Sequence, residues 1–322
     1  MSWIKDFKLT VADLSFVGQD LSRPECVLAE KSGDLWISDN RHALTHLCPD
    51  GSVEKIGQSG ETNGFTMDSQ GNFIVADWMH NKVLKISRQG ETSVILDAFE
   101  GKPLPPTNYV YCDSQDRLWI AISSRRQPWF DAAANPQPDG FVLLLEPGKA
   151  PRIVAEGITF TNEVRLDPAE KYLYVAETMA SKISRFPIQS DGNLGSKETF
   201  GPESLGDTHQ VDGFCLDAEG NVWVTTVLRN GLMVIDAQTR EAHTVLEDPN
   251  EAGLQASKEA LENGTMTPMH MMGCIGKTLL LVTSVNFGGP DLKTVYLGSL
   301  GMNRLASFQA PVAGAPMPHW NR

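Results

Sequence analysis

The stretch PPTNYVYCDSQDRLWIAI, residues 105–122, places a lone asparagine, Asn108, before an apolar run centred on Trp119. The run LWIAI has the aromatic and β-branched content of a buried strand, and the preceding DSQD is typical of a tight turn. The amide stands 11 residues ahead of the strand centre. If this spacing recurs, the chain is built from repeats, and the repeat decides the fold.

The spacing recurs five more times. The matching strand-like segments are GDLWISD (33–39), GNFIVAD (71–77), KYLYVAE (171–177), GNVWVTT (220–226) and KTVYLGS (293–299). A polar residue lies 11 or 12 residues before the centre of each segment. The six polar residues are Glu25, Asn63, Asn108, Asn162, Asp212 and Ser284. They are 38 to 72 residues apart, which is close to the length of a four-stranded propeller blade.

Further strand signals complete each repeat, among them KVLKIS, FVLLLEP and GLMVID as third strands. We therefore predict an all-β, six-bladed β-propeller that occupies residues 1–322 as one domain. The leading segment FKLTVADLSFV, residues 7–17, contains one more strand signal. We expect this N-terminal strand to complete the last blade and to remove a free sheet edge.

Two segments interrupt the repeat. EAGLQASKEALENG, residues 251–264, has helix-forming composition and predicts a surface helix that ends at Asn263 and Gly264. SSRRQPWFDAAANPQPDG, residues 123–140, has the proline and asparagine content of a long irregular loop. Such a loop is either a lid or binding loop, or a plain surface insertion.

Composition restricts the class of protein. The chain has 27 Lys and Arg against 40 Asp and Glu, a net charge of −13, which argues against nucleic acid as a partner. No apolar run has the length of a membrane span or a signal peptide. The five cysteines are scattered and form no CxxC pair, so we expect reduced and mostly buried thiols. A soluble cytoplasmic protein of unspecified oligomeric state, with a small-molecule partner, is expected.

The polar positions predict a cation site. The first strand of each blade lines the central channel, so equivalent positions point toward one axis. Glu25 and Asp212 bring two carboxylates there, and Asn63, Asn108 and Asn162 bring amide oxygens. Such a set suits a hard divalent ion, calcium foremost, with magnesium, manganese or zinc as alternatives. Any one of these residues alone is better explained as a turn residue. Five together favour a shared site, with the serine of the sixth repeat as a spectator.

The repeats and their polar residues resemble those of a known family, that of senescence marker protein (regucalcin), gluconolactonase and luciferin-regenerating enzyme. The resemblance runs from RPECVLAEKSGDLWISD, residues 23–39, to TSVNFGGPDLKTVYLGSL, residues 283–300, where it is most specific. It implies a six-bladed propeller with a metal ion in the central channel, in agreement with the expectation from the repeats.

The resemblance also implies roles for individual residues. Glu25, Asn162 and Asp212 correspond to residues that bind the metal. Asn108 corresponds to an asparagine that lies at the metal or against the substrate. Asn63 corresponds to a residue that supports a ligand or contacts the substrate.

One departure concerns the substrate. Sugar lactonases of this family tend to carry an arginine and an aspartate beside the third asparagine, and both are missing around Asn108. A polyhydroxylated substrate needs such hydrogen-bond partners. Tyr109 and Trp129, with Trp78 and Phe130, instead indicate either a more apolar or aromatic substrate or simply packing residues.

The expected function is a metal-dependent hydrolase of lactones or related esters. The metal polarises the carbonyl, water attacks, and Asp212 acts as the general base. Direct attack by Asp212 in a phosphotriesterase, and a calcium-binding scaffold without catalysis, are the alternatives. No histidine is assigned a catalytic role, and His209, three residues before Asp212, is the one to test.

Overall fold

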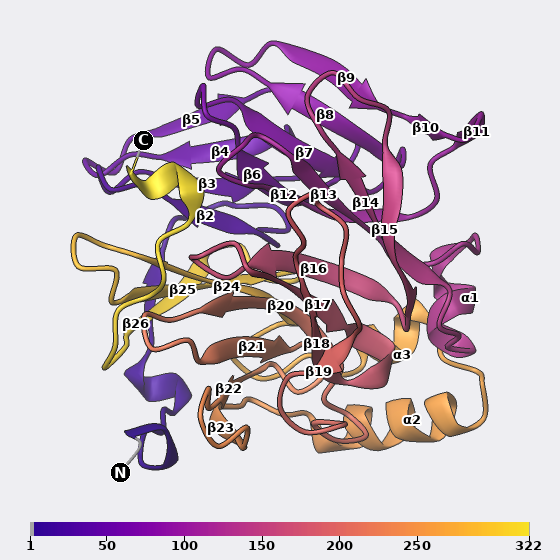
Figure 1. Ribbon diagram of the computed structural model, residues 1–322. Helices are drawn as coiled ribbons and strands as arrows, with labels where there is room; N and C mark the ends of the chain where they lie inside the picture. Colours follow the sequence, from indigo (N-terminus) through magenta and orange to yellow (C-terminus); the bar gives the residue numbers. More distant parts are fainter. Residues whose placement is uncertain (1–2, 322) are drawn as a thin grey trace.

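The computed structural model describes residues 3–321, and most of its regular structure is β-strand. Six four-stranded antiparallel sheets form the six blades of a β-propeller (Figure 1), and a small hairpin, β10 (Ala98–Phe99) with β11 (Lys102–Pro103), adds a seventh sheet. The fold predicted from the repeat spacing is confirmed.

The first strands of neighbouring blades contact one another, except that the first blade reaches the first strand of the second blade through its own second strand, and the first strands therefore surround the axis. The first strands are β2 (Val27–Ala29), β6 (Thr62–Met67), β12 (Thr107–Cys112), β16 (Thr161–Leu166), β20 (Val211–Leu216) and β24 (Val282–Gly288). The second strands are β3 (Leu35–Ser38), β7 (Phe73–Asp77), β13 (Leu118–Ile122), β17 (Tyr172–Glu177), β21 (Val222–Thr226) and β25 (Thr294–Ser299).

The outer half of each blade contains two further strands. The third strands are β4 (Leu44–Leu47), β8 (Lys82–Ile86), β14 (Gly140–Leu145), β18 (Lys182–Pro187), β22 (Gly231–Ile235) and β26 (Leu305–Gln309). The outermost strands are β5 (Val53–Ile56), β9 (Thr92–Leu96), β15 (Arg152–Ile158), β19 (Glu198–Thr199), β23 (Ala242–Leu246) and β1 (Ser15–Val17). The N-terminal strand β1 pairs with β26 through Ser15 opposite Ser307, so the predicted closure of the last blade is confirmed.

An aspartate fixes the turn between the first and second strands in several blades. In the fifth blade, Asp217 Oδ1 accepts the backbone N–H groups of Glu219 and Asn221, both at 2.9 Å. Its Oδ2 accepts the indole N–H of Trp223, also at 2.9 Å. Because one carboxylate binds both the turn and the tryptophan, the two must stand a fixed number of residues apart in the sequence.

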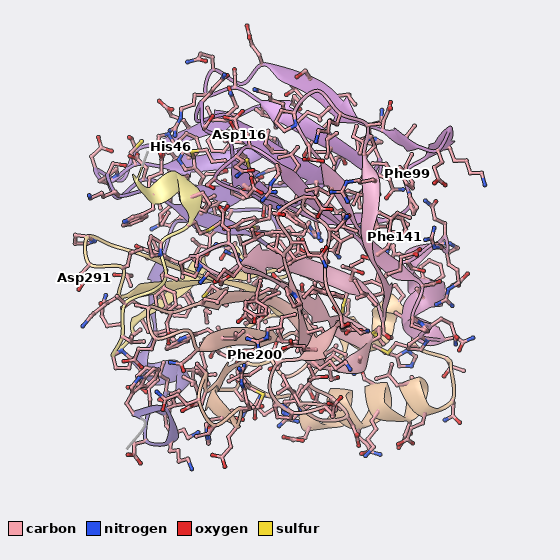
Figure 2. All side chains as sticks on the ribbon, in the orientation of Figure 1. His46, Phe99, Asp116, Phe141, Phe200 and Asp291 are labelled. Carbon is pink, nitrogen blue, oxygen red and sulfur yellow. The ribbon has the colours of Figure 1, made fainter. Side chains whose placement is uncertain are left out.

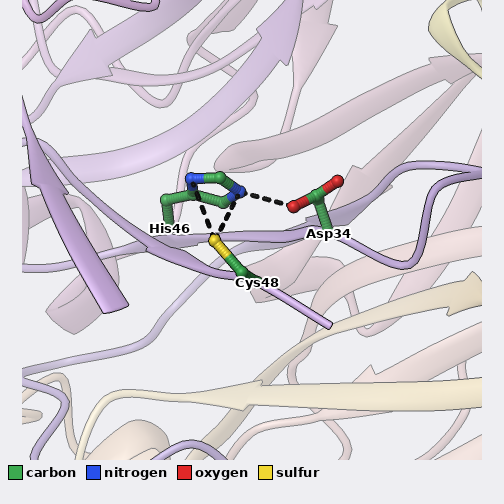
Figure 3. A group of neighbouring side chains, drawn as sticks. All are labelled: Asp34, His46 and Cys48. Atoms are coloured by element: carbon green, nitrogen blue, oxygen red, sulfur yellow. Dashed lines mark hydrogen bonds and ion pairs between the residues drawn. The ribbon is translucent and has the colours of Figure 1, made fainter. Parts of the chain in front are cut away.

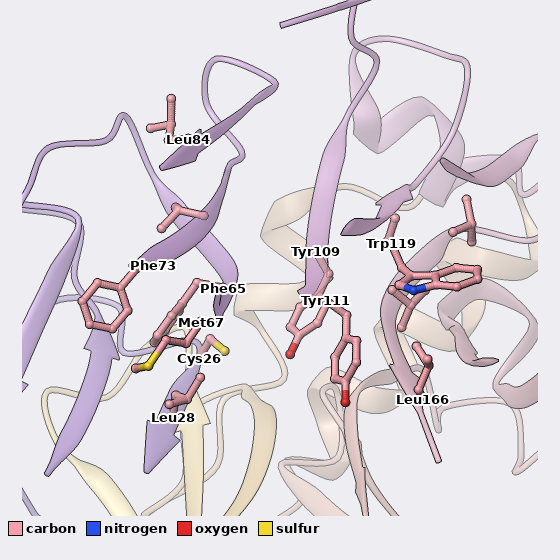
Figure 4. Close-up of a cluster of buried hydrophobic side chains, with 14 of the residues drawn as sticks. Cys26, Leu28, Phe65, Met67, Phe73, Leu84, Tyr109, Tyr111, Trp119 and Leu166 are labelled. Atoms are coloured by element: carbon pink, nitrogen blue, oxygen red, sulfur yellow. The ribbon is translucent and has the colours of Figure 1, made fainter. Parts of the chain in front are cut away.

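The core lies between the blades. Tyr109 and Tyr111 on β12 pack in one cluster with Phe65 and Met67 of β6 and with Trp119 of β13 (Figure 4). Other inter-blade clusters are smaller. In one of them the rings of Phe99 and Phe141 lie 6.5 Å apart (Figure 2).

Within residues 3–321, three α-helices interrupt the strands. The helix α2 (Glu251–Glu262) confirms the predicted surface helix. The loop 123–140 was predicted to be irregular, but it contains α1 (Trp129–Ala134), because its WFDAAA segment is rich in helix-forming alanine. The helix α3 (Pro268–Met272) was not predicted.

The helices mark one end of the channel. Figure 1 shows α1 and α3 close together on one side of the molecule and the short 3-10 helix η4 (Pro318–Asn321) on the opposite side. The other 3-10 turns are η1 (Trp3–Lys5), η2 (Val11–Asp13) and η3 (Thr178–Ala180). In the described part of the chain, no helix combines the length and apolarity needed to cross a membrane.

Candidate active site

The inner strands are irregular where the site was predicted. In five blades the register between the first and second strands shifts at the predicted polar residue. The shifts lie between Thr62 and Phe65, Thr107 and Tyr109, Thr161 and Val164, Val211 and Phe214, and Val282 and Ser284. Such bulges locally break the ladder and re-aim a side chain. They explain how an interior strand can present a polar group to the channel.

The predicted residues meet at one cavity. It has a volume of about 330 Å³ and lies at the channel end covered by α1 and α3. Its polar lining includes Glu25, Asn63, Asn108, Asn162 and Asp212. Side chains from five blades therefore converge as the repeat spacing predicts.

Three other predicted residues have different positions. Trp129 of α1 lines the cavity. Tyr109 is 1% exposed, belongs to the inter-blade core, and is absent from the cavity lining. It follows Asn108 directly, and successive residues of a strand point to opposite faces. Ser284 is buried outside the cavity and its hydroxyl has no hydrogen-bond partner among residues 3–321.

A chain of hydrogen bonds orients the amides. Arg23 Nη2 donates to Asn63 Oδ1 at 2.9 Å, and Asn63 Nδ2 donates to Asn108 Oδ1 at 3.0 Å. Asn108 Nδ2 then donates to Ser123 Oγ at 3.2 Å, and this hydroxyl donates to the carbonyl of Thr161 at 3.0 Å. Both ends of the Asn63 amide are thus engaged, so Asn63 positions Asn108.

The two acids of the site resist ionisation. Burial raises the pKa of Glu25 to about 7, although the charge of Arg23 lowers it. Burial, followed by the charges of Glu25 and Glu163, raises the pKa of Asp212 well above its ordinary value. Two carboxylates in one buried site repel each other, and a cation relieves both this repulsion and the loss of solvation.

The donor set fits a hard divalent cation. Glu25 is buried at the cavity, and the guanidinium of Arg23 is paired with its Oε2 atom. Asn162 Nδ2 donates to Thr178 Oγ1 at 3.1 Å, which fixes the orientation of that amide. Glu25, Asn108, Asn162 and Asp212 together offer only oxygen ligands, which calcium and magnesium prefer.

A buried ion pair lies beneath the acids. Glu163 Oε2 accepts from Nε and Nη2 of Arg165, both at 3.1 Å. Arg165 Nη1 donates to Asn286 Oδ1 at 3.0 Å. Arg165 also lines a second cavity of about 290 Å³, which the C-terminal segment 315–320 borders. The pair therefore lies between the acids and the far end of the channel.

A different cluster has mixed ligand atoms. Asp34, His46 and Cys48 of the first blade form the one group of three His, Cys, Asp or Glu residues within 3–321 whose ligand atoms are close enough to share an ion (Figure 3). The His46 Nε2 atom lies 2.7 Å from Asp34 Oδ1. The Cys48 sulfur lies 3.8 and 3.6 Å from the two ring nitrogens. The carboxylate of Asp34 and the thiol of Cys48 thus both contact the ring of His46.

Sequence reasoning missed the residues two positions before the predicted ones. Arg23, Glu61, Phe160 and Gln210 all line the cavity. Each precedes a predicted residue by two, but all four lie before the first strand of their blade, and Arg23 and Phe160 have positive φ. The recurrence of this offset in four repeats is the sequence signal that could have identified them.

His209 serves a different part of the molecule. Its Nε2 atom lies 3.6 Å from Glu247 Oε1, and Glu247 also accepts two hydrogen bonds from Arg229. His209 is absent from the cavity lining.

The geometry agrees with a family match. Residues 23–251 match the SMP-30/gluconolactonase/LRE-like region. The chain belongs to this family. Membership in the SMP-30/gluconolactonase/LRE-like family supports a lactonase-type hydrolase.

Individual relatives are distant. Human serum paraoxonase/arylesterase 1 is 28% identical over 155 residues, which are 45% of this chain and only 40% of that protein. The 6-deoxy-6-sulfogluconolactonase of Pseudomonas putida is 23% identical over 273 residues, 82% of this chain and 78% of that protein. The crystal structure of regucalcin, a calcium-binding protein from Agrobacterium tumefaciens, has a TM-score of 0.66 at 17% identity and covers 95% of this chain and 97% of that one. This last likeness shows the fold alone.

Proposed function

We propose that this protein hydrolyses lactones or related esters with a divalent cation held by Glu25, Asn108, Asn162 and Asp212. The observation that carries the proposal is the convergence of these four oxygen-bearing side chains on one cavity. The similarity to 6-deoxy-6-sulfogluconolactonase supports lactone chemistry. The calcium-binding regucalcin supports calcium as the first ion to test.

The residues of this chain have separate tasks in the proposed reaction. When bound, the cation supplies Lewis acidity at the carbonyl oxygen of the substrate. Asp212, on the bulged strand β20, takes the proton of the attacking water with one carboxylate oxygen. Asn63 keeps the amide of Asn108 turned to the site through its hydrogen bond.

The Asp212→Asn variant tests the assignment. Asparagine retains the size and one metal-binding oxygen but cannot act as a base. We expect kcat to fall by roughly 10²- to 10⁴-fold, the usual contribution of general base catalysis, with part of the cation affinity retained. Both proteins are first stripped of metal with a chelator. Calcium titration calorimetry then measures the affinity, and lactone hydrolysis at saturating calcium measures kcat.

Asp207→Asn is the matched control. Asp207 is exposed and forms an ion pair with Lys258 at 2.8 Å, so its amide variant should retain both cation binding and turnover. Near wild-type turnover of Asp212→Asn on a good substrate contradicts the role of Asp212. Loss of both properties in the control variant points to a general folding effect.

A second candidate is phosphotriester hydrolysis at the same site. The partial match to serum paraoxonase/arylesterase favours testing it, and a site that polarises C=O also polarises P=O. A panel of lactones, aryl esters and organophosphates with added cations separates the candidates. Cation binding without hydrolysis of any of them would support the scaffold alternative.

A further inference from the structure

The cavity is divided into a polar floor and an apolar wall. The floor consists of the oxygen-bearing side chains of the inner strands. The wall facing it comes from α1 and α3 and includes Trp129, Phe130, Met271 and Met272. Phe130 is 39% exposed and Met272 is 46% exposed. Apolar side chains exposed together around a cavity indicate a binding surface.

The aromatic part of the wall is continuous. The ring of Trp129 lies 5.8 Å from that of Trp78, 6.1 Å from that of Phe130 and 6.4 Å from that of Phe160. All four residues line the cavity. Aromatic rings at these separations form a stable packed surface that offers area rather than hydrogen bonds.

The helical part of the wall is anchored. Met271 and Ala134 pack against a buried cluster that includes Leu254 of α2. Ser257 of α2 donates to the carbonyl of His270 in α3 at 3.1 Å. The wall is therefore a built part of the fold, while its methionines remain adaptable in shape.

Most polar groups near the wall are already engaged, although the Oε1 atom of Gln210 has no hydrogen-bond partner within residues 3–321. Gln210 Nε2 donates to the carbonyl of Asp207 at 3.0 Å. Thr178 Oγ1 accepts from Asn162, and Glu61 is paired with Arg23 at 3.0 Å. A sugar ring placed against this wall would find few free partners besides Gln210 Oε1 for its several hydroxyl groups, and hydroxyl groups left unpaired in a buried site weaken binding.

From this division we infer that the substrate is a lactone or ester with an apolar substituent, which is either an alkyl chain or an aromatic ring. This substituent packs between Trp129 and Met271 while the carbonyl of the substrate faces the floor. The inference rests on the proposed function and adds the substrate class. The small cavity volume suits a substrate with one ring or a short chain.

A series of γ-lactones that differ only in alkyl chain length tests the inference. With calcium-loaded protein, kcat/KM should rise roughly fourfold for each methylene that the wall buries. Glucono-δ-lactone should be a poorer substrate than the longest alkyl lactone. A kcat/KM that does not change with chain length, or that is higher for the sugar lactone, overturns the inference.

A pair of variants on one helix locates the effect. Met271→Ala should lower kcat/KM for the longest lactone by roughly tenfold, the value of a few lost apolar contacts, and hardly change that of γ-butyrolactone. Met269→Ala is the matched control, because Met269 is 77% exposed and does not line the cavity. An equal effect of Met271→Ala on the short and long lactones contradicts the assigned packing.

Binding of non-hydrolysable lactams keeps this test independent of turnover. If no ester or lactone is hydrolysed, the proposed function fails, but calorimetry with an alkyl lactam and with a hydroxylated lactam still tests the wall. Tighter binding of the alkyl lactam, weakened by Met271→Ala and not by Met269→Ala, supports the inference. Binding of neither lactam, or tighter binding of the hydroxylated one, overturns it.

Discussion

The guanidinium of Arg23 lies against the Oε2 atom of Glu25 as an ion pair at the floor of the cavity. The same guanidinium contacts Glu61 Oε1 at 3.0 Å and Asn63 Oδ1 at 2.9 Å. Arg23 therefore neutralises one proposed cation ligand and also supports the amide that orients another. Neutralising Glu25 weakens cation binding, whereas supporting Asn63 strengthens it.

Replacing Arg23 by Met distinguishes the two tasks. If competition for Glu25 dominates, removal of the fixed positive charge should tighten calcium binding by about tenfold, which corresponds to about 1.4 kcal/mol. Calorimetric titration measures this change. Arg125→Met, which breaks an exposed ion pair with Glu156, should leave the affinity unchanged. Weaker binding by Arg23→Met would show that support of Asn63 dominates.

Gly64, next to Asn63, is required by close packing. A Cβ atom at this position would overlap the ring of Tyr109 on the neighbouring inner strand. We expect Gly64→Ala to lower the free energy of unfolding by about 1–3 kcal/mol, the usual cost of overpacking, and to weaken calcium binding because Asn63 shifts.

Urea unfolding and calorimetry measure the two effects of Gly64→Ala. Gly195→Ala is the control, because a Cβ there makes a tight contact of 3.3 Å with Pro187 Cγ without overlap, and neither residue lines the cavity. Its calcium affinity should be unchanged. Unchanged calcium affinity in a destabilised Gly64→Ala protein would contradict the prediction and would show that the packing of Tyr109 does not affect the geometry of the site.

The sequence spacing was sufficient to predict the blades, the closure by the N-terminal strand and the convergence of residues such as Asn108 and Asp212. Equivalent positions in a rotationally repeated fold must meet at its axis, so the repeat alone contains this information. Tyr109 shows that a residue next to a site residue in the sequence need not belong to the site, because it adjoins Asn108 but its side chain packs in the core.

The rest of the site depends on tertiary contacts. The bulges at Asn108 and Asp212 need an extra residue relative to the partner strand, which no single segment reveals. The wall combines α1, in the long loop, with α3, which begins more than 130 residues later. Residues 123–140 alone therefore could not show whether that loop is a wall of the cavity or a plain insertion.

Glu247 gives the fold a pH dependence at acid pH. Burial raises the pKa of Glu247, but hydrogen bonds from His209 and Arg229 lower it more, to about 2. A depressed pKa in the folded state means that the unfolded chain binds more protons between pH 2 and 4.5. The resulting stabilisation is present above pH 4.5 and is lost as the pH falls toward 2.

Glu247→Gln should remove this contribution. We expect the variant to lose about 1–3 kcal/mol of stability at neutral pH, the value of hydrogen bonds to a charged group. The difference from wild type should shrink as the pH is lowered. Urea unfolding at several pH values measures both effects, and a difference that stays constant with pH would exclude Glu247 as the titrating group.

The turn aspartates should be stabilising in proportion to their burial. Asp217 is 1% exposed and accepts backbone N–H groups as well as the indole N–H of Trp223. Asp217→Ala leaves these donors without an acceptor, and each buried one, as at Asn221 and Trp223, costs about 1–3 kcal/mol. We expect a loss of at least about 3 kcal/mol in the free energy of unfolding.

Asp50→Ala removes a similar turn carboxylate, which accepts from Ser52 at 2.9 Å, but at an exposed position where water replaces it. Urea unfolding should therefore show a much smaller loss for Asp50→Ala, and equal losses would mean that the buried indole bond in the fifth blade adds nothing to the turn.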